Sequence, residues 1–187
     1  MTSPVKILGV SGSGRKGSYN TALLREAKSL LPPNATLEIF DVSAFPLFNE
    51  DREREPPKEV VEFKRKIREA DAVLFASPEF NFSVTAQMKN ALEWANRPEE
   101  DNAWDGKPAA IVSASTSVRG GARAQLQLRQ IMVDLNLLPL GQPNLYLGSA
   151  QHAFDNDLKL VDPKQRKNLE ALLKALVDWT LRLKAAS

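Results

Sequence analysis

A loop rich in glycine and serine, residues 12–20, lies between an apolar run and an amphipathic run near the start of the chain. The apolar run, Val5–Val10, is typical of a buried strand, and the run that follows, Thr21–Leu31, is typical of a helix. Glycines let the backbone of such a loop approach a ligand closely, and the free N–H groups at a helix start attract an anion. The sequence therefore predicts a phosphate site between the first strand and the first helix.

Strand-like and helix-like runs alternate along the rest of the chain. The predicted strands are Val5–Val10, Thr36–Phe40, Ala72–Ala76, Ala109–Ser113 and Asn144–Leu147. The predicted helices are Tyr19–Leu31, Pro57–Ala70, Thr85–Asn96, Arg119–Leu137 and Pro163–Lys184. This alternation predicts an α/β fold with a doubly wound parallel sheet, and 187 residues suit a single domain over residues 1–187. Ligands of such sheets bind at the carboxyl ends of the strands.

The composition excludes several classes of protein. The absence of cysteine excludes disulfides, thiolate catalysis and Cys-ligated metals, and no cluster of metal ligands is visible. With 25 basic and 23 acidic residues the formal charge is +2, which gives no electrostatic footprint for nucleic acid. No run approaches the ~20 apolar residues of a membrane span, and no secretory leader is visible. We therefore expect a cytoplasmic protein that does not bind membranes.

Three kinds of phosphate ligand can be compared with this loop. Gly12, Gly14 and Gly17 match the G-x-G-x-x-G of dinucleotide-binding proteins, and Asp41 follows about 20 residues later, so a Rossmann dehydrogenase remains open. A nucleoside-triphosphatase is excluded, because its loop needs a lysine where this chain has Ser18. The many side-chain donors favour the dianionic phosphate of a mononucleotide such as FMN. These donors are Ser11, Ser13, Arg15, Ser18 and Asn20.

Four segments in order resemble motifs of the NADPH-dependent FMN reductase family, over essentially the whole chain. Residues 12–20 resemble its G-S-x-R-x-x-S-x-N, and residues 46–51 its P-L-Y-N-E-D. Residues 78–94 resemble P-E-Y-N-x-S-x-P-G-x-L-K-N-A-x-D-W, and residues 120–130 resemble G-G-A-R-x-Q-x-x-L-R-Q. Phe80 stands where the family has tyrosine, and residues 85–87 (Thr-Ala-Gln) replace Pro-Gly-x. These departures bear on substrate preference and on the entry into the following helix.

The resemblance implies a flavodoxin-like fold, with a five-stranded sheet in the order 2-1-3-4-5 between two layers of helices. It also implies FMN as cofactor and NADPH or NADH as reductant. Hydride would pass to the flavin, and electrons would pass on to a small-molecule acceptor: a quinone, an azo dye, a metal oxyanion or free flavin. Relatives form homodimers or homotetramers. A flavodoxin-type electron carrier without turnover of its own remains the second alternative.

The expected FMN site has two parts. The phosphate is assigned to Ser11, Ser13, Arg15, Gly17, Ser18, Tyr19 and Asn20, and the ring to Pro78, Glu79, Phe80, Asn81 and Ser115. No side chain is expected to act as a catalytic acid or base, because the flavin carries the chemistry. The choice between NADPH and NADH stays open, with Arg119 and Arg123 as candidates for contact with a 2′-phosphate.

Overall fold

The computed structural model describes residues 3–186 and contains one parallel sheet. Its strands are β1 (Val5–Ser11), β2 (Ala35–Phe40), β3 (Ala72–Ala76), β4 (Pro108–Ala114), β5 (Leu138–Pro139) and β6 (Leu145–Leu147). The order is β2-β1-β3-β4-β5, and β6 also pairs with β4. Since β5 pairs with the start of β4 and β6 with its end, two short strands fill the fifth position. The predicted flavodoxin-like order 2-1-3-4-5 is confirmed, and it differs from the Rossmann order 3-2-1-4-5-6.

Every predicted helix is present, with small changes at the ends. The α-helices are α1 (Tyr19–Leu30), α2 (Lys58–Glu69), α3 (Ala86–Asn96), α4 (Ala122–Asp134) and α5 (Pro163–Ala186). Short 3₁₀ helices occur at η1 (Glu50–Arg52), η2 (Glu99–Asp101) and η3 (Ala150–His152). The start of α4 is later than predicted, because Gly120 and Gly121 adopt φ angles of 61° and 84° and form a turn instead of helix. No helix within residues 3–186 is long and apolar enough to cross a membrane.

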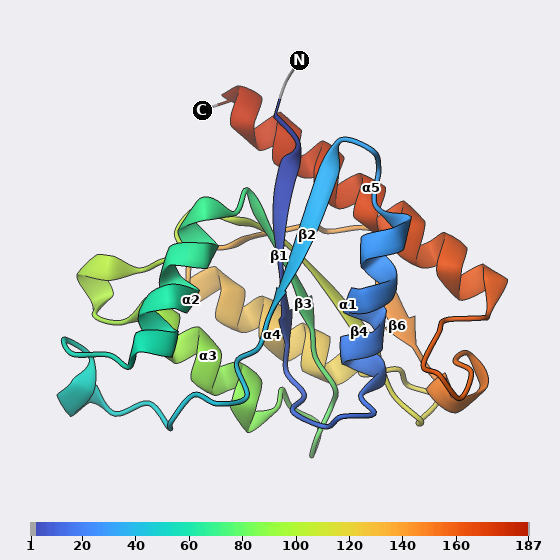
Figure 1. Ribbon diagram of the computed structural model, residues 1–187, viewed down its shortest axis with the longest axis horizontal. Helices are drawn as coiled ribbons and strands as arrows, with labels where there is room; N and C mark the ends of the chain where they lie inside the picture. Colours follow the sequence, from blue (N-terminus) through green and yellow to red (C-terminus); the bar gives the residue numbers. More distant parts are fainter. Residues whose placement is uncertain (1–2, 187) are drawn as a thin grey trace.

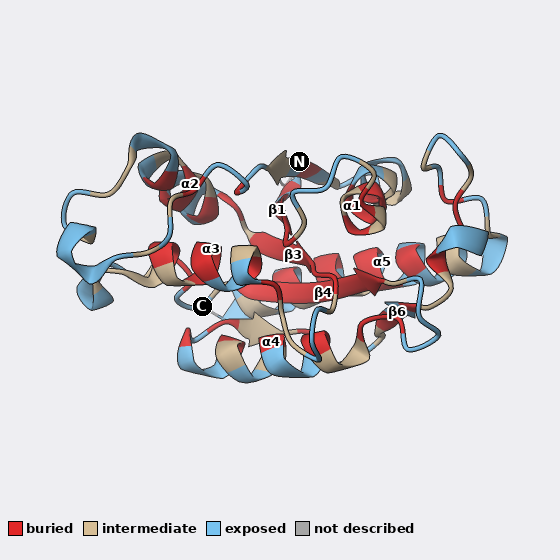
Figure 2. Ribbon diagram, turned by 90° about the horizontal axis from the view of Figure 1, so that it is seen from below, coloured by how far each residue is buried: buried red, intermediate tan, exposed pale blue. Residues whose placement is uncertain are grey.

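Helices cover both faces of the sheet (Figures 1 and 2). One buried apolar cluster includes residues of α1 and α5, and the other includes residues of α2, α3 and α4. The strands β3 and β4 are buried along their whole length, which explains their continuous apolar sequences. The loops that follow β1, β3 and β4 meet at one edge of the sheet, at the bottom of Figure 1. Parallel strands therefore bring residues from three distant segments to one place.

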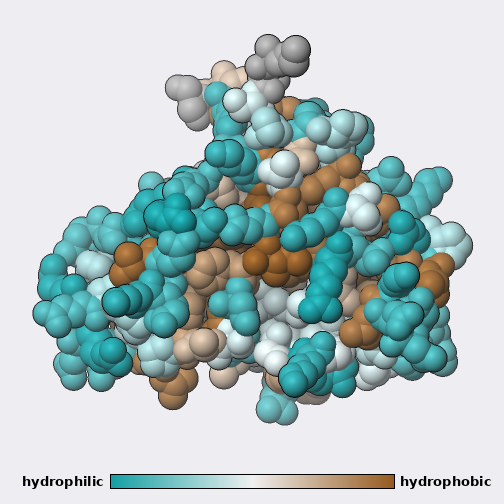
Figure 3. Space-filling model, in the orientation of Figure 1, coloured by the Kyte–Doolittle hydropathy of each residue, from teal (hydrophilic) through white to brown (hydrophobic). Residues whose placement is uncertain are grey.

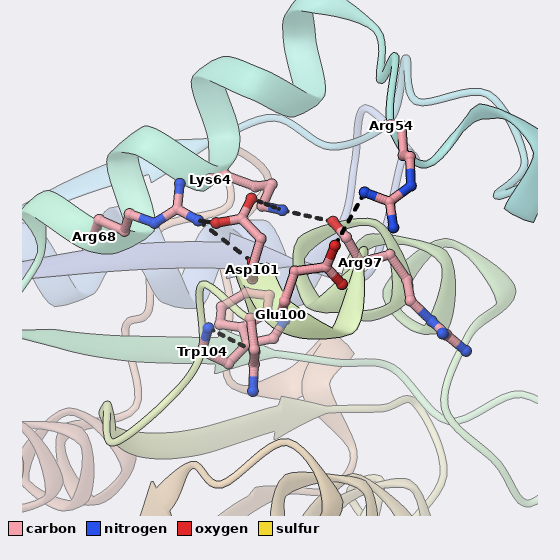
Figure 4. Close-up of polar contacts among 8 residues, drawn as sticks. Arg54, Lys64, Arg68, Arg97, Glu100, Asp101 and Trp104 are labelled. Atoms are coloured by element: carbon pink, nitrogen blue, oxygen red, sulfur yellow. Dashed lines mark hydrogen bonds and ion pairs between the residues drawn. The ribbon is translucent and has the colours of Figure 1, made fainter.

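A network of ion pairs fixes the segment between α3 and β4 against α2 (Figure 4). Lys64 is almost fully buried, donates to the carbonyl of Arg97 at 2.5 Å and pairs with Asp101 at 2.6 Å. Arg68 pairs with the same carboxylate, and the indole of the buried Trp104 donates to a carbonyl of α3 at 3.0 Å. None of these residues lines the clefts described below, so we assign the network a structural role.

Candidate functional site

The loop between β1 and α1 offers several unused hydrogen-bond donors. The main-chain N–H groups of residues 14–17 have no acceptor within the described residues. Ser18 is the N-cap of α1: its hydroxyl oxygen accepts the N–H of Thr21 at 3.2 Å and keeps its own hydrogen free. Arg15 donates to the carbonyl of Gly17 and lies 5.9 Å from the ring centre of Tyr19. A cation, a hydroxyl and free N–H groups at a helix start are the donors that a dianionic phosphate needs.

Ser11, the last residue of β1, and Ser13 differ in whether their hydroxyls are free to bind a ligand. The hydroxyl of Ser11 is hydrogen-bonded to that of Thr21 at 2.8 Å and accepts the N–H of Ser13 at 3.3 Å. The hydroxyl of Ser13 has no partner among residues 3–186, and Ser13 lines the cleft described below. Ser11 therefore shapes the loop, whereas Ser13 is free to bind a ligand.

Asn20 joins the first turn of α1 to the end of β4. Its amide nitrogen donates to the carbonyl of Ala114 at 2.9 Å, and its amide oxygen accepts the N–H of Ala114 at 2.9 Å. The side chain is buried, so both bonds satisfy groups that water does not reach. One amide N–H is left for a ligand. The pair of bonds holds residues 12–20, which we name the phosphate loop after the predicted ligand, beside the loop that follows β4.

A cleft of about 240 Å³ opens between the phosphate loop and the ends of β3 and β4. Its lining consists of Ser13, Arg15, Ser18, Tyr19, Asn20, Pro78, Glu79, Phe80, Ala114, Ser115 and Thr116. The structure thus brings together the residues predicted for the phosphate and for the ring, apart from Ser11, Gly17 and Asn81, which lie outside this lining. Ala114 and Thr116, which flank the predicted Ser115 but were not assigned themselves, also line the cleft because β4 ends there.

Glu79 lines the cleft, but its carboxylate is bound to the start of α4. It accepts the N–H and the guanidinium Nε of Arg123 at 3.0 and 2.7 Å, and it lies 3.4 Å from the N–H of Ala124. The N-cap of α4, Gly121, has no side chain to offer, so Glu79 caps this helix from the loop after β3. Burial raises the pKa of Glu79, but the hydrogen bonds from Arg123 and Ala124 outweigh it, and the pKa lies below its ordinary value. Glu79 is therefore ionised and holds the start of α4 against the loop after β3, and we call it an ionised anchor for this reason.

Residues 80–83 form a tight turn that exposes two aromatic rings. Phe80 and Ser83 exchange main-chain hydrogen bonds of 3.1 and 2.9 Å, and Asn81 and Phe82 between them adopt φ angles of 51° and 67°. Phe80 is 61% exposed at the cleft. The guanidinium of Arg123 lies over the ring of Phe82, 3.6 Å from the ring centre. The exposed ring of Phe80 is a surface on which a flat aromatic ligand can stack.

Two residues not assigned from the sequence hold α3 against the phosphate loop. Thr85, the N-cap of α3, accepts the N–H of Met88 at 3.1 Å and donates to the carbonyl of Gly12 at 2.7 Å. Gln87 donates to the carbonyl of Ser11 at 3.4 Å. A Cβ at Gly12 would lie only 3.0 Å from the Thr85 hydroxyl, so glycine permits this close approach. In the sequence Thr85 and Gln87 both belong to the Thr-Ala-Gln departure at residues 85–87. Thr85 was predicted as the first residue of the helix and is instead its N-cap.

Comparisons with known proteins agree on one family. The sequence model described as NADPH-dependent FMN reductase matches residues 5–152. An NAD(P)H-dependent FMN reductase of Pseudomonas aeruginosa is 47% identical to this chain, over 98% of the chain and 100% of the relative. An NADPH:quinone oxidoreductase of Arabidopsis thaliana is 44% identical, over 96% of the chain and 93% of the relative.

A solved structure supports the same family. FerB, a flavoenzyme NAD(P)H:(acceptor) oxidoreductase from Paracoccus denitrificans, superposes with a TM-score of 0.88 at 31% identity. The match covers 95% of this chain and 98% of that one. The family resemblance predicted from the four motifs is thereby confirmed, and with it FMN as cofactor and NAD(P)H as reductant. The chain belongs to the NADPH-dependent FMN reductase family.

Proposed function

We propose that this protein is an NAD(P)H:quinone oxidoreductase that holds one FMN in the cleft beside the phosphate loop. The observation that carries the proposal is that one cleft is lined both by donors of the phosphate loop and by the exposed ring of Phe80. The donors in its lining are Ser13, Arg15, Ser18 and Asn20. The phosphate is assigned to Ser13, Arg15, Ser18 and the free N–H groups of residues 14–17, and the ring to Phe80 and the loop at Ser115. Relatives named as quinone reductases, in Arabidopsis thaliana and Pseudomonas putida, support a quinone as the acceptor.

The residues of the cleft bind FMN and orient it. Bound FMN supplies the redox chemistry, accepting hydride from NAD(P)H and passing electrons to the quinone. Glu79 is the only carboxylate among the lining residues, and Arg123 keeps it ionised, so it is not placed to donate a proton. The ring of Phe80 replaces the tyrosine of the family motif and leaves the stacking surface intact while removing a hydroxyl donor.

We also propose that residues 1–187 form one FMN-binding domain. Both apolar clusters pack on the same sheet, which supports this proposal. A cytoplasmic location remains a prediction from the sequence.

A second copy of the chain is proposed as the partner, in a homodimer or homotetramer. Leu126 and Val133 lie two turns apart on the same face of α4 and are 62% and 76% exposed, and Leu47 is 80% exposed. A cleft of about 240 Å³ is also smaller than most ligand sites, so a flavin would extend beyond it. We expect the double change Leu126→Glu and Val133→Glu to shift the wild-type oligomer to monomer in sedimentation analysis. A wild-type protein that is already monomeric would contradict the proposed assembly.

The test of the proposed function combines a spectrum with an activity. The protein reconstituted with FMN is expected to show flavin absorbance after gel filtration and to oxidise NADPH in steady state when benzoquinone is added. An electron carrier of the flavodoxin type would keep the absorbance without this turnover. Retention of nicotinamide without flavin would contradict the proposal altogether.

The two neighbouring cations of the loop offer a matched comparison. We expect Arg15→Ala to weaken FMN binding by about tenfold, because a charge-assisted hydrogen bond to a phosphate contributes about 1.5–3 kcal/mol, part of which water recovers at an exposed site. Lys16→Ala should change FMN binding less than twofold, since Lys16 is outside the lining of the flavin cleft. Quenching of flavin fluorescence measures both constants. Equal losses in the two variants would count against Arg15 as the phosphate ligand.

A further inference from the structure

A second cavity, of about 430 Å³, lies between α1 and the carboxyl end of β2. Ser13 and Arg15 line both this cavity and the flavin cleft, so the two adjoin across the phosphate loop. Apart from the phosphate loop, no residue of its lining takes part in the proposed FMN binding. We call it the β2 cavity.

Positive side chains surround the β2 cavity. Arg15 and Lys16 come from the phosphate loop, and Arg25 and Lys28 come from α1, whereas Asp41 is the single carboxylate in the lining. The net charge of the whole chain is only +2, so this is a strong local concentration of positive charge. Such a cavity favours an anion of more than one charge.

The cations of α1 are not used elsewhere in the fold. Arg25 and Lys28 are exposed, form no ion pair within residues 3–186, and share one face of α1 with Thr21. Glu26, the only acidic residue of α1, is engaged outside the cavity, where its carboxylate pairs with Arg166 at 2.6 Å. Many other cations of the chain are paired with carboxylates. Arg25 and Lys28 are therefore available to a ligand of the cavity.

The rest of the lining suits a nucleoside attached to the anion. Ile39 and Phe40 are partly exposed and supply an apolar wall, against which a base can pack. Asp41 lies at the end of β2, with one carboxylate oxygen accepting the N–H of Ser43 at 2.9 Å and the other free to accept from a sugar hydroxyl. Figure 3 views the molecule from the side on which α1 and β2 lie, and hydrophilic side chains border a hydrophobic patch on that face.

We propose that the β2 cavity binds the phosphomonoester of a nucleotide, with the 2′-phosphate of NADPH as its source. This proposal rests on the proposed function, which supplies NADPH at the adjoining cleft. The sequence offered Arg119 and Arg123 as partners for this phosphate. Arg123 is instead engaged by Glu79 and Phe82, and Arg119, although exposed, lines neither the β2 cavity nor the flavin cleft. Arg25 and Lys28 take that role. A free nucleotide with the same phosphate is the other source of this chemistry.

The first experiment compares two double variants that remove the same charge. Arg25→Gln with Lys28→Gln changes the cavity, whereas Lys164→Gln with Lys167→Gln removes exposed, unpaired lysines on α5 within the described part of the chain. In the FMN-loaded cavity variant, KM for NADPH should rise by about tenfold, while kcat and KM for NADH change less than twofold. The α5 variant should match the wild type. Equal rises of KM for NADPH and NADH would contradict the role of the 2′-phosphate.

The second experiment needs no turnover. Adenosine 2′,5′-bisphosphate is titrated calorimetrically into the FMN-loaded wild type and both variants, and only the cavity variant should lose binding. Loss of this binding with an unchanged KM for NADPH would support the site and make a free nucleotide its ligand. Binding that is absent in the wild type, or equal in all three proteins, overturns the proposal. If the wild type binds the bisphosphate but does not oxidise NADPH, the proposed function is contradicted, whereas the proposed phosphate site in the β2 cavity is supported.

Discussion

Replacing Asn20 with alanine is expected to lower the free energy of unfolding by about 3 kcal/mol, because it leaves two buried main-chain groups unpaired, each costing about 1–3 kcal/mol. The groups are the N–H and the carbonyl of Ala114, which the amide of Asn20 binds at 2.9 Å each. Urea denaturation of the wild type and the variant measures the difference. Asn168→Ala on α5 is the control, since Asn168 is exposed and makes only a long hydrogen bond of 3.4 Å to Gln165.

The same variant separates two roles for Asn20 in ligand binding. If Asn20 positions the phosphate loop against the loop after β4, Asn20→Ala should weaken binding of both FMN and riboflavin, the same flavin without its phosphate. If its main role is to donate a hydrogen bond to the phosphate, only FMN binding should fall. The two amide bonds to Ala114 favour the first result. A variant as stable as the wild type would show that these bonds do not hold the two segments together.

Glu79→Ala is expected to be the second severe change, with a loss of about 2–3 kcal/mol of stability, because it leaves a guanidinium and the start of α4 without their anion. The side chain of Glu79 is 9% exposed, but that of Arg123 is 35% exposed, so water recovers part of the cost. Thermal unfolding measures the effect, and Glu79→Gln is the matched variant, since it keeps an acceptor and removes the charge. We expect Glu79→Gln to lose less stability than Glu79→Ala.

The charge of Glu79 also predicts how this stabilisation depends on pH. The pKa of Glu79 in the folded protein lies below its ordinary value of 4.5, so folding favours the ionised form. The stabilisation is complete above the ordinary pKa and is lost as the pH falls through the lower, folded value. The stability difference between wild type and Glu79→Gln should therefore be constant near neutral pH and shrink below pH 4.5. A difference that grows on acidification would contradict the assignment of Glu79 as an ionised anchor.

Local patterns in the sequence were enough to predict most of the fold. The strand β3 was predicted with its observed ends, because an unbroken apolar run stops at Ser77 and Pro78. The loop rich in glycine and serine was predicted between a strand and a helix, and it lies between β1 and α1. In contrast, β5 has only two residues and was not predicted, since its pairing depends on the neighbouring strand β4.

The parts of the site that the sequence did not reveal depend on contacts between distant segments. Asn20 and Ala114 are 94 positions apart, and Glu79 and Arg123 are 44 apart, so no local pattern links either pair. The residue types alone could not show that the Glu79 carboxylate would face α4 or that the Asn20 amide would bind β4. The β2 cavity likewise forms only when α1 packs beside β2.

The most direct test of phosphate binding by this protein compares its dissociation constants for FMN and riboflavin. If the loop at residues 12–20 binds the phosphate, FMN should bind about a hundredfold more tightly than riboflavin, which corresponds to about 2.7 kcal/mol. Quenching of flavin fluorescence during titration gives both constants. Equal affinity for the two flavins would show that the loop does not bind the phosphate.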